Sequence, residues 1–489
     1  VPNNTEEPVP VTLIGETDST IEGGGVGLFA ANGDSKNIII DFKGLTYEIV
    51  KDLVGSSGTV SQSFHLEKGN TVTLTNGKIT SNLSIMLIQN YCNLTLDGII
   101  LDGKETNTYV VSNNFGKTVI TGKTEIIAAE GKVAFDVYYG LSESYFEGVT
   151  VCIDENFTGS ITGKVEYGSS DLVTDDTWID NTVLEFAEGN TGTFNIELYV
   201  HRYYQPLANA DKANINVAGG TFTSVLNPNY IAEGANLYTN GTNYKVGQSA
   251  AEGYDQVVAV VTDAEGQYVA GYATLQAAIN AAGEDDTIVL VNNVTESVTV
   301  PAGKTITLDL NGYTLTNSTG TTITNLGTLT IEDSSNDKTG AVYGNSEYAL
   351  FNEIGATATL NGGLFTNSGN ASYVISNHGT MTINEGVTMI QASGNAVAGP
   401  SGIASGYYTP DDKSKTAYLT INGGKFSSPR ITIKNDEISY LTINGGEFDV
   451  EGTNVQSVQN WTYTTITGGT FYGTVHMWTY DSVPVRGEL

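Results

Sequence analysis

Short segments in which apolar residues alternate with threonine, each followed by a pair of glycines, recur along this chain. LTINGGKF begins at Leu419, and LTINGGEF begins at Leu441. A third copy, TTITGGTF, begins at Thr464. Strict alternation of this kind predicts half-buried β-strands. A nearly fixed period in the low twenties predicts a solenoid in which each repeat forms one coil.

The same pattern occurs in more distant parts of the chain. ATLNGGLF ends at Phe365, and INVAGGTF ends at Phe222. In the first half, Leu74, Leu96 and Ile120 occupy equivalent positions of similar segments, and their spacings fall in the same range. We therefore predict an all-β protein with a coil period of about 22–25 residues.

Asparagines recur at one corner of the predicted coils. Where such a residue stacks on its copies, its side-chain amide can hydrogen-bond to the coils on either side. Asparagine also tolerates the left-handed backbone conformation. We therefore expect a ladder of amide hydrogen bonds at these corner positions, which also tolerate a left-handed backbone: Asn90, Asn113, Asn325, Asn352 and Asn377.

One segment departs from the strand pattern. YATLQAAINAA, from Tyr272 to Ala282, places its apolar residues on one face of a helix. We predict that this helix covers the open first coil of a second solenoid. DLNGYTL at Asp309 parallels DFKGLTY at Asp41, which argues for two tandem copies of one design.

These boundaries predict five parts. They are an extended tail (residues 1–10), a first solenoid (11–246) with loop insertions around 138–204, a linker hairpin (247–270), a second solenoid (271–475) that begins with the capping helix, and a C-terminal tail (476–489).

Composition supports this fold class and restricts the partners. The chain holds 57 glycines but only 21 lysines and arginines, and its formal net charge is −33. That charge repels phosphate backbones and anionic headgroups, so we expect no nucleic-acid partner. No run of 18 apolar residues occurs, so we expect no membrane insertion.

The two cysteines, Cys92 and Cys152, are separated in sequence by a stretch that corresponds to two or three coils. At about 4.8 Å per coil, the two are separated by roughly 10 to 14 Å. Because that separation exceeds the reach of a disulfide, we predict two free, buried thiols.

A resemblance emerges between Gly219 and Asn317, where GGTF is followed by a hairpin and then by GYATLQAAINAAGEDDTIVLVNNVTESVTVPAGKTITLDLNGYTLTN. This segment is similar to the repeating units of large secreted surface proteins of anaerobic, often gut-dwelling bacteria, and of adhesin-like proteins of some methanogenic archaea. The coils resemble the right-handed parallel β-helix of the pectate-lyase-like fold. The resemblance covers most of residues 200–475 and, more weakly, 37–130. It implies two tandem right-handed parallel β-helices in an extracellular setting, and it implies no reaction.

A β-helix enzyme is the first alternative. Asn377 to Gly379 resembles the His-Gly motif of polygalacturonases, but ISNHGTMTI aligns with ITNLGTLTI. His378 therefore occupies the position of Leu326 in an ordinary coil, and the carboxylates that such hydrolases use are missing.

A pectate-lyase-like site needs a basic residue together with carboxylate-bound calcium. The nearest candidate combines Arg430 with Lys434, Asp436 and Glu437. Because this match is poor, we predict no catalytic activity and keep a polysaccharide lyase or hydrolase as the alternative.

Glycan binding is the second alternative, because exposed aromatic rings stack on sugars while carboxylates and amides bind hydroxyls. The competing interpretation is that tyrosines of an all-β protein pack across strands. The glycan candidates are Trp178, Tyr203, Tyr204, Tyr407 and Tyr408. We predict no cofactor, apart from surface calcium at paired acids, with solvated turns as the competing interpretation: Asp175, Asp176, Asp411 and Asp412.

Self-assembly is a further expectation. The segment from His476 onwards shows no helical pattern and therefore no cap, and an uncovered coil can accept strands of a neighbouring molecule. The candidate assembly residues are Val9, Val11, Leu13, Trp478, Val483 and Val485. A chain that starts at Val1 rather than at methionine fits a mature secreted protein whose signal peptide has been removed, or a chain that has been trimmed. We therefore expect an extracellular structural or adhesin-like protein whose partners are further copies of itself, joined end to end, or surface glycans.

Overall fold

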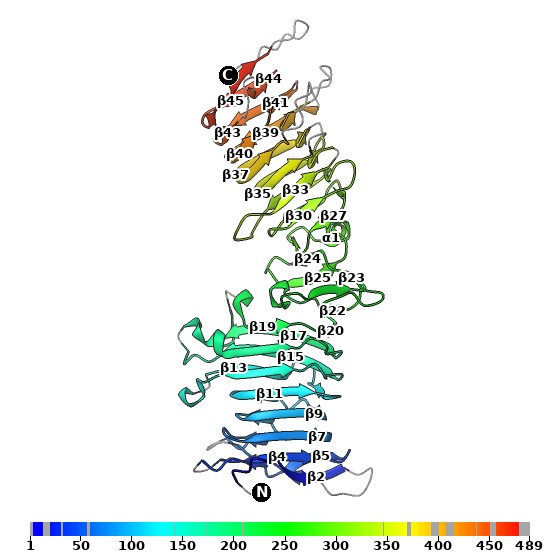
Figure 1. Cartoon of the computed structure of the whole chain (residues 1–489), viewed down its shortest axis with the longest axis vertical. Coiled ribbons are helices and arrows are strands. Elements are labelled where there is room, and N and C mark those ends of the chain that lie inside the picture. Colours follow the sequence, from blue (N-terminus) through cyan, green and yellow to red (C-terminus); the bar gives the residue numbers. More distant parts are fainter. Residues whose placement is uncertain are drawn as a thin grey trace. The chain divides into compact units, whose positions relative to one another are not determined.

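A computed structural model of the protein describes residues 3–12, 20–30, 33–55, 59–140, 142–173, 175–207, 210–345, 347–368, 373–392, 401–406, 415–436, 438–449 and 456–478. The described part is all-β, with large parallel sheets and one short α-helix, as the alternation of apolar residues predicted (Figure 1). The chain divides into two compact units, Val1–Gln256 and Val257–Leu489.

The first unit contains three ladders of parallel strands. The first ladder holds β1 (Val9–Thr12), β4 (Asn37–Asp41), β7 (Thr71–Thr80), β9 (Asn93–Asp102), β11 (Gly116–Thr121), β14 (Val149–Ile153), β16 (Thr182–Phe186) and β19 (Ile215–Val217). The second holds β2 (Thr20–Gly24), β5 (Thr46–Lys51), the later parts of β7 and β9, β12 (Glu125–Ile127), β15 (Ser160–Ser169), β17 (Thr193–Arg202) and β20 (Gly220–Phe222). The third holds β3 (Val26–Leu28), β6 (Gln62–Leu66), β8 (Met86–Asn90), β10 (Tyr109–Asn113), β13 (Val133–Tyr139) and the later parts of β15 and β17.

The register of these ladders confirms the coil period. Leu74 pairs with Leu96, and Leu96 pairs with Ile120, as their spacing predicted. The same inward column continues through every coil of the first ladder and is filled by apolar side chains: Val11, Ile40, Leu74, Leu96, Ile120, Ile153, Phe186 and Val217.

The region 138–204 is more regular than predicted. Strands β13 to β17 continue the coils through it, and only the connections between them project: one carries the 3₁₀-helix η2 (Glu143–Tyr145) and another carries η3 (Asp176–Asn181). After β20 the unit ends in antiparallel strands β21 (Asn236–Thr239), β22 (Tyr244–Gly247) and β23 (Asp255–Gln256). The aromatic residues of this region therefore belong partly to the coils.

The second unit also contains three parallel ladders. The first runs through β26 (Thr287–Leu290), β29 (Thr305–Asp309), β32 (Thr328–Glu332), β35 (Thr357–Asn367), β37 (Thr380–Ile390), β39 (Ala417–Ile421), β42 (Ser439–Ile443) and β45 (Tyr463–Ile466). The second holds β27 (Val294–Thr295), β30 (Thr314–Thr316), β33 (Ala341–Gly344), the later parts of β35 and β37, β40 (Lys425–Ser427), β43 (Glu447–Asp449) and β46 (Thr470–Phe471). The third holds β28 (Val298–Val300), β31 (Ile323–Asn325), β34 (Leu350–Asn352), β36 (Ile375–Asn377), β38 (Ile403–Ser405), β41 (Ile431–Asn435), β44 (Gln456–Asn460) and β47 (Thr474–Met477).

The predicted capping helix is present as α1 (Leu275–Ala281). The Thr274 side chain caps its N-terminus by accepting from the Ala277 amide, and Leu275 and Ile279 are buried in the same core as the first coils of this unit. The predicted hairpin is also present, as β24 (Ala259–Thr262) and β25 (Tyr268–Tyr272). Because β24 pairs with β26, the hairpin is the first layer of the second unit rather than a separate linker.

The corner asparagines form the predicted ladder. Asn325 donates to Asn352 and Asn352 donates to Asn377, each at 2.8 Å, and all three side chains are buried. In the first unit Asn90 donates to Asn113 at 3.3 Å. None of the five asparagines adopts the left-handed backbone that this residue tolerates, since none has a positive φ. Each is the last residue of its strand and keeps extended geometry, which already points its amide along the stack.

The two segments that look alike in sequence form the same turn. In the first unit Asp41 Oδ1 accepts from the Lys43 amide at 2.9 Å, and in the second Asp309 Oδ1 accepts from the Asn311 amide at 2.9 Å. In both turns the two residues at the tip have positive φ, and the second of them is a glycine, Gly44 or Gly312. Two strands of different units therefore end in one design of turn.

Both cysteines are buried and free, as the coil spacing predicted. Cys152 pairs in register with Val119 on the neighbouring strand β11. Burial raises the pKa of the Cys152 thiol to about 11, which keeps it protonated at neutral pH.

Candidate functional site

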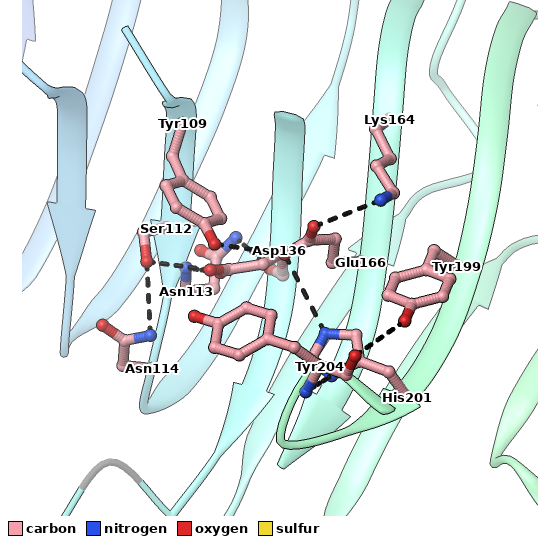
Figure 2. Close-up of polar contacts among 10 residues, drawn as sticks. All are labelled: Tyr109, Ser112, Asn113, Asn114, Asp136, Lys164, Glu166, Tyr199, His201 and Tyr204. Carbon is pink, nitrogen blue, oxygen red and sulfur yellow. Dashed lines mark hydrogen bonds and ion pairs between the residues drawn. The ribbon is translucent and has the colours of Figure 1, made fainter. Parts of the chain in front are cut away.

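Four neighbouring strands of the first unit carry a column of polar residues. Ser112 on β10, Asp136 on β13, Glu166 on β15 and Tyr199 on β17 occupy equivalent register positions (Figure 2). Successive side chains of a strand alternate between faces, so these four lie opposite the apolar residues that fill the coil interior. We call this group, together with Tyr109, Tyr138, Lys164, His201 and Tyr204, the acid–tyrosine cluster.

Asp136 is the most deeply buried acid of the cluster, with an exposed fraction of 3%. Its Oδ2 accepts from the Ser112 hydroxyl at 2.9 Å, and its Oδ1 accepts from the Asn113 amide. Burial raises the pKa of Asp136 well above its usual range, and the nearby Glu166 raises this pKa further. The two hydrogen bonds oppose that rise but do not cancel it. Asp136 is therefore a carboxyl group that retains its proton to higher pH than an exposed aspartic acid.

Glu166 lies beside Asp136 and is 6% exposed. The Tyr109 hydroxyl donates to its Oε2 at 3.2 Å, and Lys164 Nζ lies 3.7 Å from its Oε1. Burial raises the pKa of Glu166, and the charge of Lys164 partly opposes that rise. The ammonium of Lys164 also lies 4.1 Å from the centre of the Tyr199 ring, a cation–π contact.

His201, on β17, is the histidine of the cluster and has no exposed surface. Its Nδ1 accepts from the Tyr204 amide at 3.1 Å, which assigns the imidazole proton to Nε2. Nε2 lies 3.9 Å from Glu166 Oε2, too far for a hydrogen bond. Burial lowers the pKa of His201 to about 4, and the charge of Lys164 lowers it further. At neutral pH His201 is therefore an uncharged ring.

A tight hairpin covers the cluster. Strand β17 turns into β18 (Gln205–Pro206) through Tyr203 and Tyr204, which have φ values of 46° and 57°. Two positive φ values in a two-residue loop mark a type I′ turn, which glycine and asparagine usually occupy. The Tyr204 ring stacks on His201 at 5.2 Å and on Tyr138 at 6.3 Å, and these contacts hold the unusual turn in place.

This arrangement places two carboxyl groups and an imidazole, all with shifted pKa values, close to one another. It can also bind hydroxyl groups through its carboxylates and tyrosines. Access is the limiting factor: Asp136 and Glu166 are almost completely covered, whereas Tyr203 and Tyr204 are about half exposed, at 52% and 53%. A ligand that approaches from solvent meets the tyrosine hairpin first.

The structure separates the glycan candidates. Tyr203 and Tyr204 are exposed, and Tyr204 lies at the cluster (Figure 2). Trp178 is fully buried in η3, where its ring packs on Tyr167 at 5.6 Å, so the expectation that it is available to stack on a sugar is wrong. Burying an aromatic ring of this size beneath the connection that carries η3 stabilises the fold more than exposing the ring to water. Tyr407 and Tyr408 lie outside the described residues.

The described calcium candidates make separate local contacts. The Asp175 side chain caps η3 by accepting from the Thr177 amide at 3.0 Å. Asp176 Oδ1 lies 3.5 Å from a guanidinium nitrogen of Arg202. Asp411 and Asp412 lie outside the described residues.

The residues weighed for enzyme activity occupy ordinary coil positions where they are described. The His378 amide donates to the Asn352 carbonyl, just as the Leu326 amide donates to the Val300 carbonyl, which confirms the alignment of His378 with Leu326. Lys434 pairs with Asp436 at 2.6 Å on the strand that follows Arg430. Glu437 lies outside the described residues.

The assembly candidates are described only in part. Val9 and Val11 lie in β1, which pairs with β4 in register. Trp478 follows β47 and stacks on Trp461 at 5.0 Å and on His476 at 4.6 Å. Leu13, Val483 and Val485 lie outside the described residues.

A second candidate surface lies on the second unit. On the seven strands β29, β32, β35, β37, β39, β42 and β45, the first two outward positions of each strand stand in register, and all fourteen are threonine or tyrosine. The third outward position holds Asp309 on β29 and Glu332 on β32, which pair with each other in register. We call them the threonine–tyrosine face: Thr305, Thr307, Thr328, Thr330, Thr357, Thr359, Thr380, Thr382, Tyr418, Thr420, Tyr440, Thr442, Tyr463 and Thr465. The residues between them point inward and are mostly aliphatic, such as Ile306, Leu329 and Leu441.

The tyrosines of this face form an exposed stack. The Tyr418 and Tyr440 rings are 5.5 Å apart and nearly parallel, and the Tyr440 and Tyr463 rings are 5.0 Å apart. All three remain 39–48% exposed. Beside the threonines runs a surface ladder of amides, in which Asn384 donates to Asn361 at 2.7 Å and accepts from Asn422 at 2.9 Å.

Comparison of the chain with known proteins identifies no relative that would assign a role to either surface. No protein-family model matches the chain, and no curated protein and no solved structure shows significant similarity to it. Among the described residues, no group of three or more His, Cys, Asp or Glu side chains is placed to hold a metal ion. No described helix combines the length and apolar character that crossing a membrane requires.

Proposed function

We propose that this protein is an extracellular, adhesin-like surface protein that acts by contact and carries out no reaction. The observation that carries the proposal is the threonine–tyrosine face, on which fourteen positions of seven neighbouring strands hold no charged side chain. The chain as a whole has 54 acidic residues and a net charge of −33. A regular uncharged face on so acidic a chain is a surface suited to contact with a partner.

The architecture supports this proposal. The stability of a solenoid sums over neighbouring coils, so a large, flat surface can be built without enlarging a single core. The shared turn at Asp41 and Asp309 supports the further proposal that the two units are tandem copies of one right-handed β-helix. The net negative charge of the chain disfavours nucleic acid as a partner.

The acid–tyrosine cluster has a structural role in this proposal. Asp136 and Glu166 are covered by the tyrosine hairpin, and their partners are residues of neighbouring strands. The cluster therefore joins four coils and holds the tyrosine hairpin in place. The contacts of Asp136 and Glu166 are explained by this structural role without a substrate.

An antibody raised against the purified protein tests the location. Applied to intact cells of the organism that produces the protein, it is expected to label the outer surface. Labelling that appears only after the cells are permeabilised would overturn the proposal. Release of new reducing ends or unsaturated products from neutral or acidic polysaccharides by the purified protein would contradict the non-catalytic part.

End-to-end assembly is a second proposal. Among the described residues, β1 pairs only with β4 and β47 pairs only with β44, so each presents one edge to which another strand can add. Negative-stain electron microscopy of the full chain at increasing concentration is expected to show rods of growing length. Single particles of constant length at every concentration would contradict it.

A further inference from the structure

We propose that the threonine–tyrosine face binds an uncharged polysaccharide in an extended conformation, with the sugar chain running along the stack of coils. This inference rests on the proposed function and names the partner of its contact surface. Three properties of the face lead to it: its charge, its repeat distance and the chemistry of its side chains.

Charge restricts the class of partner. With 54 acidic and 21 basic residues, the chain repels an acidic polysaccharide at long range. The face itself offers no lysine or arginine at its fourteen positions to overcome that repulsion. A partner without net charge meets no such barrier, and its contact with these fourteen positions desolvates no charged side chain among them.

The repeat distance matches a polymer of sugars. Neighbouring strands lie about 4.8 Å apart, so equivalent side chains recur at that spacing along the face. The tyrosine rings recur at 5.5 Å and 5.0 Å. One pyranose unit of an extended chain advances by a comparable length, so each sugar meets an equivalent set of side chains on the next coil. Weak contacts that repeat in this way add up, because each bound sugar raises the effective concentration of the next.

The side chains offer the groups that sugars need. Each threonine presents a hydroxyl that both donates and accepts, and its branched side chain is held in few rotamers by the strand. The adjacent amide ladder at Asn361, Asn384, Asn422 and Asn444 is tied along its length by hydrogen bonds of 2.7–2.9 Å. Preorganised groups lose little entropy on binding. Because the tyrosine rings already stack on one another, they offer their edges and hydroxyls to the ligand.

Two pairs of lysine substitutions test the proposal. Thr420→Lys/Thr442→Lys places two charges on the face on neighbouring coils, where the two threonines are in register. The matched control is Thr299→Lys/Thr324→Lys, two outward threonines that are in register on the third ladder of the same unit. Both variants change the net charge equally. Circular dichroism and thermal unfolding establish that each is folded, and Thr359→Lys/Thr382→Lys is the second face variant if the first does not fold.

Binding is measured by sedimentation of the full-length protein with microcrystalline cellulose and with insoluble chitin, and by affinity electrophoresis in polygalacturonate as the charged comparison. We expect the protein to bind at least one of the two uncharged polymers and not to bind polygalacturonate. The folded face variant is expected to bind at least about tenfold more weakly, which corresponds to about 1.4 kcal/mol, while the control changes less than about twofold.

Several outcomes overturn the inference. They are the absence of binding to both uncharged polymers, binding to polygalacturonate alone, and equal binding by the face variant and the control. Wild-type oligomers that the face variant converts to monomers would show that the face binds a second copy instead. Each of these results leaves the surface labelling of intact cells unaffected, so failure of this inference is distinguishable from failure of the proposed function.

Discussion

Replacing Asn352 by alanine tests how strongly the corner asparagines hold the coils of the second unit together. The Asn352 amide is fully buried and donates to Asn377 Oδ1 at 2.8 Å and to the Thr380 carbonyl at 3.1 Å. Its Oδ1 accepts from Asn325 Nδ2 at 2.8 Å. The substitution removes all three hydrogen bonds and leaves the partners in a space that the missing side chain no longer fills.

The expected loss of stability follows from these contacts. A hydrogen bond contributes about 0.5–1.5 kcal/mol net, and a buried partner left unsatisfied costs about 1–3 kcal/mol. Because Asn325 retains a second bond to the Thr357 carbonyl, we expect a total loss of about 3 kcal/mol. The second unit spans Val257–Leu489. For a unit of that size, about 3 kcal/mol lowers the unfolding temperature by about 6–12 °C.

Asn384→Ala is the matched control, because Asn384 belongs to the second asparagine ladder of the same unit. Asn384 makes two side-chain hydrogen bonds of 2.7 and 2.9 Å, but at the surface, where water replaces the lost partner. We expect it to cost less than about 0.5 kcal/mol. Differential scanning calorimetry of the full chain measures both variants. Equal shifts for Asn352→Ala and Asn384→Ala would refute the reasoning, since burial would then make no difference.

The other predictions concern the first unit. The folded-state pKa of Asp136 is raised, so its contribution to stability is present below the ordinary pKa of 3.8 and is lost as the pH rises through the folded-state value. Asp136→Asn is therefore expected to raise the unfolding temperature at pH 8 and to lose that advantage at low pH, and a pH-independent effect would contradict this. Gly168→Ala would place a Cβ 2.5 Å from the His201 ring and is expected to destabilise the unit by about 1–3 kcal/mol, whereas the control Gly247→Ala, with 3.8 Å of clearance, changes stability little, as thermal melts would show. Because burial raises the pKa of Cys152 to about 11, its thiol is expected to resist a thiol reagent at pH 8 until denaturant is added, and rapid labelling of the folded protein would contradict its burial.

Periodicity predicted much of this fold, because in a solenoid one local pattern repeats with nearly constant spacing. The equivalence of Leu74, Leu96 and Ile120 is confirmed residue by residue. The capping helix was also predictable, since its period of 3.6 differs from the period of 2 on either side. The sequence predicts a linker hairpin at residues 247–270, but the membership of the hairpin in the second unit depends on the pairing of β24 with β26, which no local pattern reveals.

The threonine–tyrosine face follows from the same alternation, but a strand pattern alone does not distinguish a contact surface from an ordinary outward face. The alternation of threonine with aliphatic residues that marks each strand, as in Thr328 to Ile331, also predicts which residues point outward. The inward residues and the glycines define the coil, and the outward threonines are equally explained by the preference of threonine for strands. Along the outward positions of successive coils, a column of threonine changes to tyrosine at Tyr418.

The acid–tyrosine cluster could not be found in this way, because its spacings are irregular. Ser112, Asp136, Glu166 and Tyr199 are in register, yet the sequence separation between neighbouring members grows from each coil to the next, since the connections that carry η2 and η3 lengthen the coils. A search for a fixed period cannot align these residues, because connections of different length make successive coils unequal. One local signal remains: in VAFDVYY a single acid interrupts an apolar run. Burying a carboxyl group without partners costs several kcal/mol, so an acid in such a run indicates neighbours that hydrogen-bond to it. In this fold those neighbours must come from an adjacent coil, and that is where Ser112 and Asn113, which donate to Asp136, lie.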